Sequence, residues 1–223
     1  MTGADAALRL IRNYTELRTP SIVPEVKLHL ASEILELWKE TEATLYLKAV
    51  GSGEAPPPYW AFAWPGGQAL SRYILDRRHL FAGKSLLDFG SGSGLVAIAA
   101  AIAGAAPVVA AEIDAGACIA IEANAESNGV FIEPIQNDLI GSNGRWDVIC
   151  AGDMCYERPL AEHAVEWLRG LAAAGAEVLL GDPGRTYFPK AGIEMLCTYQ
   201  VPTSRELEDR DTRETSVYRL LPR

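Results

Sequence analysis

One loop constrains the fold of this chain more than any other stretch of its sequence. An apolar run ends at Leu86–Phe89 and is followed by glycine at every second position, in Gly90-Ser91-Gly92-Ser93-Gly94. Glycine at these positions lets the backbone turn tightly and lets a ligand approach main-chain N–H groups with no Cβ in the way. Because the apolar stretch 95–99 starts a helix directly behind the loop, the pattern predicts a ligand site at the carboxyl end of a strand in an open α/β sheet.

Asp88, two residues before the first glycine, bears on which ligand the loop binds. Residues 92–97 also satisfy the dinucleotide pattern Gly-x-Gly-x-x-Ala, and Glu112 follows Gly92 by twenty residues. A carboxylate one turn before the helix would repel a pyrophosphate, whereas it suits the cationic amino-acid portion and the sulfonium of S-adenosylmethionine (SAM). The loop therefore favours SAM, with a nucleotide, or a glycine-rich turn without a ligand, as alternatives.

Short apolar runs alternate with helical patterns from residue 83 onward. Strands are predicted at 84–89, 108–111, 131–136, 146–151 and 176–181, and helices at 94–103, 115–128 and 158–171. This alternation indicates βαβ units and a parallel sheet with helices on both faces. Beyond it we expect a helix at 190–197 and two closing strands at 198–201 and 216–220, joined by a charged, exposed turn at 204–214.

The segment before this core has a different character. Residues 1–14 have a helical pattern, residues 26–30 alternate like a short strand, and a Gly/Pro loop at 51–58 leads into the aromatic stretch 59–64. A chain of 223 residues is long enough for one α/β domain but short for two. We therefore expect an N-terminal extension over 1–58 and one domain over 59–223.

Charge and composition exclude several classes of protein. A net charge of −9 and a pI near 4.9 disfavour binding to a nucleic-acid backbone. They favour a positively charged partner, although an acidic surface kept for solubility explains them equally well. No segment approaches the eighteen or more uninterrupted apolar residues that a membrane helix needs. The chain is therefore expected to be soluble.

The compartment and the metal content are also constrained by the sequence. The first twenty residues lack the apolar block of an export signal, and the four cysteines show no Cys-x-x-Cys spacing. The three histidines are scattered, without the spacing of metal ligands. We therefore expect a cytoplasmic monomer with reduced thiols and no metal site.

Carboxylates follow the second and third predicted strands. Glu112 stands at the end of the second strand, where it can accept both ribose hydroxyls of an adenosine cofactor, and Asp114 is suited to cap the next helix. Asp138 stands where an adenine amino group is usually accepted, or serves as a turn residue. The expected cofactor-binding residues are Trp64, Asp88, Gly90, Ser91, Gly92, Gly94, Glu112, Ile113 and Asp138.

The substrate is indicated by Asp153-Met154-Cys155-Tyr156, after the fourth strand. Asp153 can attract and orient an ammonium group, and Tyr156, with Trp60 or Trp64, can contact it through cation–π interactions. A lysine amine must be held about 3 to 3.5 Å from the methyl carbon and must lose a proton before it reacts. We expect Asp153 and Tyr156 to be catalytic; the alternative for Asp153 is a cap of the helix at 158–171.

Other residues narrow this interpretation. Methyltransferases acting on amides or adenine usually carry Asn- or Asp-Pro-Pro-Tyr at this point, and Met154-Cys155 stands in place of the prolines, which disfavours glutamine and nucleobase substrates. The stretch 59–64 is expected to pass over the cofactor, with Trp64 near its methionine end, or else to pack in the core. Arg185, after the fifth strand, adds a polar rim or belongs to a turn. The expected substrate-binding residues are Trp60, Asp153, Tyr156 and Arg185.

Four motifs together resemble the seven-β-strand protein lysine methyltransferases, and within them the electron-transfer flavoprotein β-subunit lysine methyltransferase family. They are Pro58-Tyr59-Trp60-Ala61 with Trp64-Pro65-Gly66-Gly67-Gln68-Ala69-Leu70-Ser71-Arg72-Tyr73, Leu87-Asp88-Phe89-Gly90-Ser91-Gly92, Gly152-Asp153-Met154-Cys155-Tyr156, and Gly181-Asp182-Pro183-Gly184-Arg185. The resemblance runs from about residue 24 to the C-terminus. The aromatic Pro-Gly-Gly-Gln block and Asp-x-x-Tyr are far more specific than the glycine loop.

The resemblance implies a class I methyltransferase sheet of seven strands, the last of them antiparallel. It also implies transfer of up to three methyl groups from SAM to lysines of the flavoprotein β-subunit, with Asp153 and Tyr156 matching the family's Asp-x-x-Tyr motif. Animal members are mitochondrial, whereas this chain lacks a transit-like leader and resembles a bacterial cytoplasmic enzyme. A ribosomal or other basic protein as the substrate, a non-catalytic regulatory module that binds SAM or a nucleotide, and an NAD-dependent oxidoreductase are the alternatives.

Overall fold

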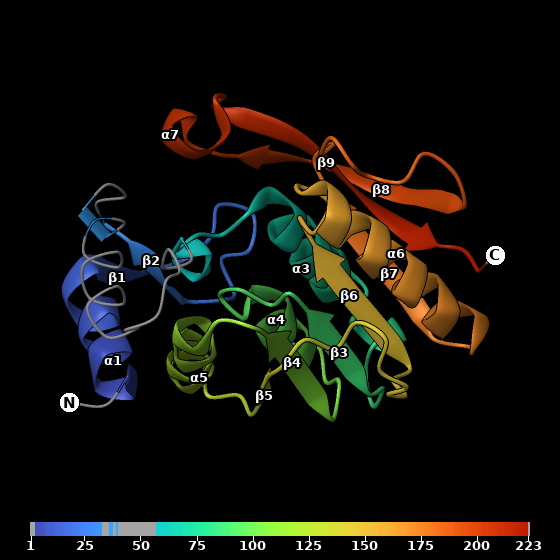
Figure 1. Cartoon of the computed structure of the whole chain (residues 1–223). Helices are drawn as coiled ribbons and strands as arrows, with labels where there is room; N and C mark the ends of the chain where they lie inside the picture. Colours follow the sequence, from blue (N-terminus) through green and yellow to red (C-terminus); the bar gives the residue numbers. More distant parts are fainter. Residues whose placement is uncertain (1–2, 33–35, 38, 40–56, 223) are drawn as a thin grey trace.

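Seven strands form the central sheet of the computed structural model, which describes residues 3–32, 36–37, 39 and 57–222. In chain order they are β3 (Leu86–Phe89), β4 (Val108–Glu112), β5 (Glu133–Gln136), β6 (Val148–Gly152), β7 (Glu177–Asp182), β8 (Ile193–Pro202) and β9 (Thr212–Leu220). They lie in the order β5-β4-β3-β6-β7-β9-β8 (Figure 1). β9 pairs antiparallel with β7 and β8, and the other pairs are parallel, so the expected seven-stranded sheet with an antiparallel last strand is confirmed.

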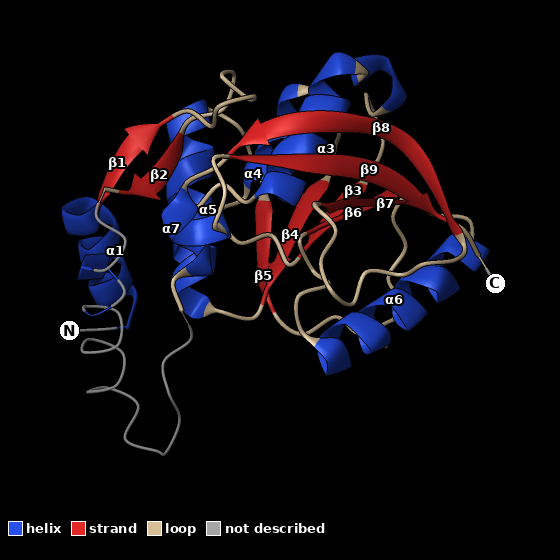
Figure 2. Cartoon of the chain, turned by 90° about the horizontal axis from the view of Figure 1, so that it is seen from above, coloured by secondary structure: helices blue, strands red, loops and turns tan. Residues whose placement is uncertain are grey.

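Helices cover both faces of this sheet. The three helices α3 (Pro65–Asp76), α4 (Leu95–Ile102) and α5 (Ala115–Asn128) lie on one side, and α6 (Arg158–Ala173) lies on the other (Figure 2). The short turns η1 (Tyr59–Ala61) and η2 (Arg78–Leu80) flank α3. The helices predicted at 94–103, 115–128 and 158–171 and the predicted parallel strands are confirmed, with ends shifted by at most two residues.

Neighbouring residues of the inner strands point to opposite faces and supply two separate cores. Leu86 and Val108 pack in the core under α3 and α4, whereas Leu87 and Val109 pack against α6. All four residues of β3 are buried, as expected for a parallel strand covered on both sides. This burial explains why β3 reads as an unbroken apolar run apart from Asp88.

The N-terminal segment packs against α5. It consists of α1 (Gly3–Tyr14) and the hairpin β1 (Thr15–Arg18) with β2 (Leu28–Ala31). The side chains of Asn124 and Asn128 fix β2 to α5, because their Oδ1 atoms accept hydrogen bonds from the backbone N–H groups of His29 and Lys27, at 2.7 and 2.9 Å. The predicted Gly/Pro loop falls largely on residues 51–56, outside the described residues.

The C-terminal region corrects the prediction of a helix at 190–197. This segment enters β8, and the whole strand pairs with β9, from Ile193 opposite Leu220 to Pro202 opposite Thr212. The positive φ of Gly192, 65°, ends any helical run just before the strand. Pairing with a distant strand therefore outweighs the local helical pattern, as is common for edge strands.

The turn at 204–214 is only partly exposed. It contains α7 (Arg205–Glu208), a single helical turn at the tip of the β8–β9 hairpin. Figure 1 shows this tip projecting past the end of the sheet, on the side where β6 and β7 end. Glu208 is only 3% exposed, so the prediction of an exposed charged turn is wrong for this residue.

Candidate active site

The glycine loop joins β3 to α4 with three residues in the left-handed region. Gly90, Gly92 and Gly94 have φ values of 68°, 53° and 80°. A Cβ on Gly90 would lie 2.2 Å from Sδ of Met154, whereas a Cβ on Gly92 would meet nothing within 4 Å. The loop therefore needs glycine both for its backbone conformation and for the close approach of Met154, and Gly92 faces open space.

Asp88 is buried beneath this loop. Its Oδ2 accepts hydrogen bonds from Ser91 Oγ at 2.5 Å and from the backbone N–H of Ala97 at 3.1 Å. Burial raises the pKa of the Asp88 carboxyl to about 7, although these two bonds act in the opposite direction. The carboxylate is directed into the loop and the first turn of α4, and Asp88 is absent from the lining of the adjacent cavity.

Glu112 ends β4 and is directed at the same loop. Its Oε2 accepts a hydrogen bond from the N–H of Gly92 at 2.9 Å, and its Oε1 accepts one from Ile113 at 2.8 Å. Asp114 caps α5, as predicted, by accepting a hydrogen bond from the N–H of Gly116 at 2.7 Å. The Glu112 carboxylate is thus held rigidly at the edge of the open space above Gly92.

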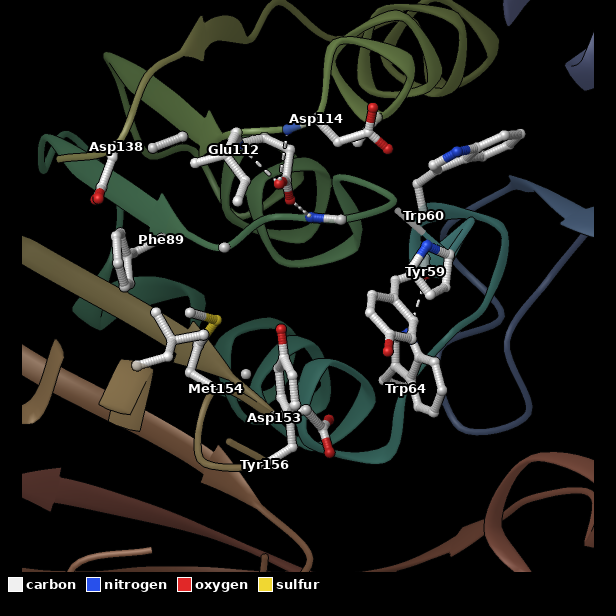
Figure 3. Close-up of a pocket in the computed structure, with 18 of the residues that line it drawn as sticks. Tyr59, Trp60, Trp64, Phe89, Glu112, Asp114, Asp138, Asp153, Met154 and Tyr156 are labelled. Atoms are coloured by element: carbon white, nitrogen blue, oxygen red, sulfur yellow. Dashed lines mark hydrogen bonds between the residues drawn. The ribbon is translucent and has the colours of Figure 1, made fainter. Parts of the chain in front are cut away.

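These elements surround a cavity of about 470 Å³ at the carboxyl ends of β3, β4 and β6 (Figure 3). Its lining includes ten of the predicted site residues: Trp60, Trp64, Gly90, Gly92, Glu112, Ile113, Asp138, Asp153, Tyr156 and Arg185. Asp88, Ser91 and Gly94 lie behind the lining. Asp138 accepts a hydrogen bond from the N–H of Ile140 at 2.9 Å, so it is a turn residue that also borders the cavity.

Asp153 follows β6 in a backbone conformation that is rare for a non-glycine residue. Its φ is 54°, and its side chain is buried. Its Oδ2 accepts a hydrogen bond at 2.5 Å from the N–H of Gly66, in the first turn of α3, where helix N-termini favour anions. The N-cap of α6 is Glu157, so the alternative role of Asp153 as a cap of that helix is wrong.

The Trp64-Pro65-Gly66-Gly67 motif makes this contact possible. A Cβ on Gly66 would lie 2.2 Å from the carbonyl oxygen of Gly181 and 2.5 Å from Oδ2 of Asp153. Gly181 O also accepts a hydrogen bond from the N–H of Asp153 at 2.9 Å. The N-terminus of α3 therefore docks on the ends of β6 and β7 by direct backbone approach, which only glycine at position 66 permits.

Arg185 faces Asp153 from the turn after β7. Its Nε and Nη2 atoms donate hydrogen bonds to Oδ1 of Asp153 at 3.0 and 2.6 Å, and Nη2 also contacts Oε1 of Glu208 at 2.6 Å. The turn itself is formed by Asp182, whose Oδ1 accepts hydrogen bonds from the N–H groups of Gly184 and Arg185. Burial raises the pKa of the Asp153 carboxyl, while Arg185 and the Gly66 N–H act in the opposite direction.

Aromatic side chains form the wall beside this ion pair. The rings of Tyr59 and Trp64 lie 5.8 Å apart, those of Tyr59 and Tyr156 lie 6.0 Å apart, and the Arg185 guanidinium lies 5.9 Å from the Trp64 ring. In Figure 3 the hydroxyl of Tyr156 points into the cavity. Burial raises the pKa of Tyr156, so this hydroxyl stays protonated at neutral pH. We call Trp64, Asp153, Tyr156 and Arg185 the amine end of the cavity.

Sequence reasoning missed other residues of the site. The cavity is also lined by Pro57, Phe89, Asn137, Met154, Leu160 and Leu207. Glu208 and Arg213 were missed as well, because the only signal in the sequence is a charged stretch in which nothing marks the two residues that turn inward. Gln68, which ends the Pro-Gly-Gly-Gln block, is buried and donates a hydrogen bond to the carbonyl oxygen of Ala63.

The cavity fits SAM by the chemistry of its walls. Glycine backbone and a rigid carboxylate, Glu112, border the open space above the loop, and aromatic rings border the other side. The sheet order, with the glycine loop after its first strand and a carboxylate ending the second, is that of the class I methyltransferase fold. Among solved structures, magnesium protoporphyrin IX methyltransferase from Synechocystis PCC 6803 with bound SAM matches with a TM-score of 0.54 at 16% identity, over 83% of this chain and 95% of that one.

Sequence comparisons identify the family. The model of ribosomal protein L11 methyltransferase (PrmA) matches residues 68–155. The electron transfer flavoprotein beta subunit lysine methyltransferase of Danio rerio is 36% identical, over 98% of this chain and 85% of the relative. The protein of the same name from Rattus norvegicus is 38% identical, over 91% of this chain and 79% of the relative. The chain belongs to the family of electron transfer flavoprotein beta subunit lysine methyltransferases.

Proposed function

We propose that this chain transfers methyl groups from SAM to lysine side chains of the electron-transfer flavoprotein β-subunit. The family names a protein lysine as the acceptor in the relatives, and the amine end of the cavity supports the same acceptor here. The observation that carries the proposal is the placement of Asp153 and Tyr156 in the same cavity as Glu112 and the glycine loop. A buried carboxylate beside aromatic rings suits a cation.

The cofactor would be held by the loop end of the cavity. The N–H groups of the Gly90–Gly94 loop, the carboxylate of Glu112 and the Asp138 turn surround the open space above Gly92. Bound SAM supplies a methyl group on a positively charged sulfur, which a neutral amine can attack. Asp88 would act indirectly, by fixing Ser91 and the start of α4.

Asp153 would attract and orient the substrate amine. Both of its carboxylate oxygens already accept hydrogen bonds, from Gly66 and from Arg185, so it acts through its charge and position rather than as the proton acceptor. The lysine must shed a proton before transfer, and a partly desolvated cavity lowers the pKa of its ammonium. The proton then leaves to solvent, since the cavity is open.

Tyr156 and the tryptophans would hold the alkyl chain and the cation of the lysine. Tyr156 is 47% exposed at the mouth of the cavity, and its ring contacts Tyr59. The phenol can accept or donate a hydrogen bond at the reacting nitrogen, while the rings exclude water from it. Trp60 serves a double purpose, because it lines the cavity and also belongs to the apolar cluster that fixes the N-terminal segment on α5.

Purified chain, SAM and the flavoprotein β-subunit test the proposal directly. Mass spectrometry should find mass increases of one to three methyl groups on lysine residues of the β-subunit, and arginine at those positions should abolish them. Since the chain carries a net charge of −9, turnover should fall as salt rises. The matched control is ribosomal protein L11, the substrate named by the family model.

The outcomes separate substrate from mechanism. Methyl groups found only on glutamine, on an N-terminus or on nucleic acid would contradict lysine specificity. Lysine methylation confined to L11 or to another basic protein would support lysine methyl transfer but reject the flavoprotein β-subunit as the substrate. Binding of SAM without transfer to any protein would favour a non-catalytic regulatory module. Tight binding of NAD would reject SAM as the cofactor.

A further inference from the structure

Glu208 connects the tip of the β8–β9 hairpin to the amine end of the cavity. Its carboxylate contacts Arg185 at 2.6 Å on Nη2 and 3.2 Å on Nη1, and it accepts a hydrogen bond from Nε of Arg213 at 3.0 Å. The side chain is 2% exposed, so these charges interact with little screening by solvent. Burying a glutamate and its two arginine partners costs desolvation free energy, so this cluster calls for a functional explanation.

The four charged groups form a balanced cluster. Asp153 and Glu208 supply two carboxylates, and Arg185 and Arg213 supply two guanidinium groups. Arg185 is shared, because its Nη2 atom contacts both carboxylates at 2.6 Å. Without Glu208 the cluster would carry one net positive charge next to the place where a cationic amine must approach.

The described groups around Arg185 support the role of Glu208 in balancing its charge. Its guanidinium faces Asp153 at the end of β6, Glu208 on α7 and the ring of Trp64 before α3. Asp182 accepts hydrogen bonds through Oδ1 from the backbone N–H groups of Gly184 and Arg185, not from the Arg185 guanidinium, and burial raises the pKa of its carboxyl to about 6. Glu208 is therefore the carboxylate that balances the part of Arg185 turned away from Asp153.

We propose that Glu208 is a positioning residue for methyl transfer: it holds Arg185 beside Asp153 and cancels its charge, so that a lysine ammonium can approach Asp153. The inference rests on the lysine methyl transfer proposed above. It assigns a role to the β8–β9 hairpin, whose tip brings this carboxylate into contact with Arg185 in the cavity wall. Leu207, the residue before Glu208, itself lines the cavity.

The first test compares Glu208→Gln with Asp211→Asn. Asp211 lies on the same hairpin and forms an ion pair with Arg205, but both side chains of that pair are exposed, at 69% and 76%. Glu208→Gln should raise the KM for the lysine-bearing protein about tenfold, because one uncompensated charge repels the substrate cation. Asp211→Asn should leave KM unchanged. Affinity for S-adenosylhomocysteine, which lacks the sulfonium charge, should stay within about twofold in both variants.

In two further variants, a change of charge and damage to the structure are expected to change KM in opposite directions. Arg213→Gln removes the cation on the far side of Glu208 and leaves one net negative charge, so KM should fall below that of the wild type. In Arg185→Gln/Glu208→Gln the cluster is neutral again, so KM should fall below that of Glu208→Gln, even though a second buried contact is lost. Damage to the fold alone would raise KM in every variant.

The results separate this inference from the proposed function. Wild-type enzyme that methylates no lysine would reject the function. If the wild-type enzyme methylates lysine but Glu208→Gln leaves KM unchanged, the role of Glu208 alone is rejected. The same holds if KM rises above the wild-type value in Arg213→Gln and above the Glu208→Gln value in the double variant. If Glu208→Gln does not fold, the sign of the KM change in Arg213→Gln decides.

Discussion

The two ends of the cavity are built in different ways. The glycine-loop end comes mainly from one strand, one loop and Glu112, and backbone N–H groups dominate its contacts. The amine end brings together side chains from the start of α3, the end of β6, the turn after β7 and the β8–β9 hairpin. The glycine-loop end is therefore fixed by local backbone conformation, whereas the amine end depends on the assembly of the whole sheet.

The largest expected effect is at the contact that joins α3 to the amine end. Gly66→Ala should lower the free energy of unfolding by about 3 kcal/mol or more, because its Cβ would lie 2.2 Å from the carbonyl oxygen of Gly181. Gly67→Ala is the matched control, since its Cβ would meet only side-chain carbons at 3.9 Å. Chemical denaturation measures both. Equal stability of the two variants would mean that α3 does not dock on the strand ends in this way.

A smaller effect is expected at the loop end. Glu112→Ala should weaken SAM binding by about 1.5 to 3 kcal/mol, because a charge-assisted acceptor is lost from a partly buried site. Glu122→Ala, at an exposed position on α5, is the control. Calorimetry measures both affinities, with circular dichroism to verify the fold. Unchanged affinity in Glu112→Ala would remove this residue from the cofactor site.

The smallest effect concerns the support of the loop by Asp88. Burial raises the pKa of its carboxyl from 3.8 to about 7 in the folded chain, so folding favours the protonated form. The resulting stability is fully present below pH 4 and is lost as pH rises towards 7. Asp88→Asn has no such loss, and its stability relative to the wild type should increase by about 2 kcal/mol between pH 5 and pH 8.

Asp147→Asn serves as the control for this pH dependence. The Asp147 carboxyl is exposed, and hydrogen bonds from Ser85 lower its pKa. A lowered pKa gives stability that is lost only as pH falls into the acidic range, so the difference between Asp147→Asn and the wild type should stay constant from pH 5 to pH 8. A constant difference for Asp88→Asn as well would show that Asp88 is ionised throughout this range.

The same contrast explains what could be predicted from the sequence. The strand, glycine loop and helix around residues 86–102 are consecutive, so their local pattern predicted the fold class and the cavity. Glu112, which ends β4, and Asp114, which caps α5, were predicted in the same way from their positions along the chain. The helix expected at 190–197 was wrong because β8 is fixed by pairing with β9, which no local pattern reports.

The amine end was predicted only in part, for the same physical reason. Asp153 and Tyr156 are visible because they follow a strand, but the partners of Asp153 lie far away in sequence, at Gly66 and Arg185. Glu208 turns inward from an otherwise charged hairpin, and its burial depends on two arginines that only the folded sheet brings together.

If the two ends of the cavity act separately, removing the charge of Asp153 should impair methyl transfer and leave cofactor binding intact. Asp153→Asn keeps the shape of the side chain and removes its charge. We expect SAM affinity, measured by calorimetry, to stay within about threefold of the wild type, and methyl transfer to the lysine substrate to fall about 100-fold or more. Transfer at the wild-type rate, or a loss of SAM binding in parallel with the loss of transfer, would contradict separate roles for the two ends of the cavity.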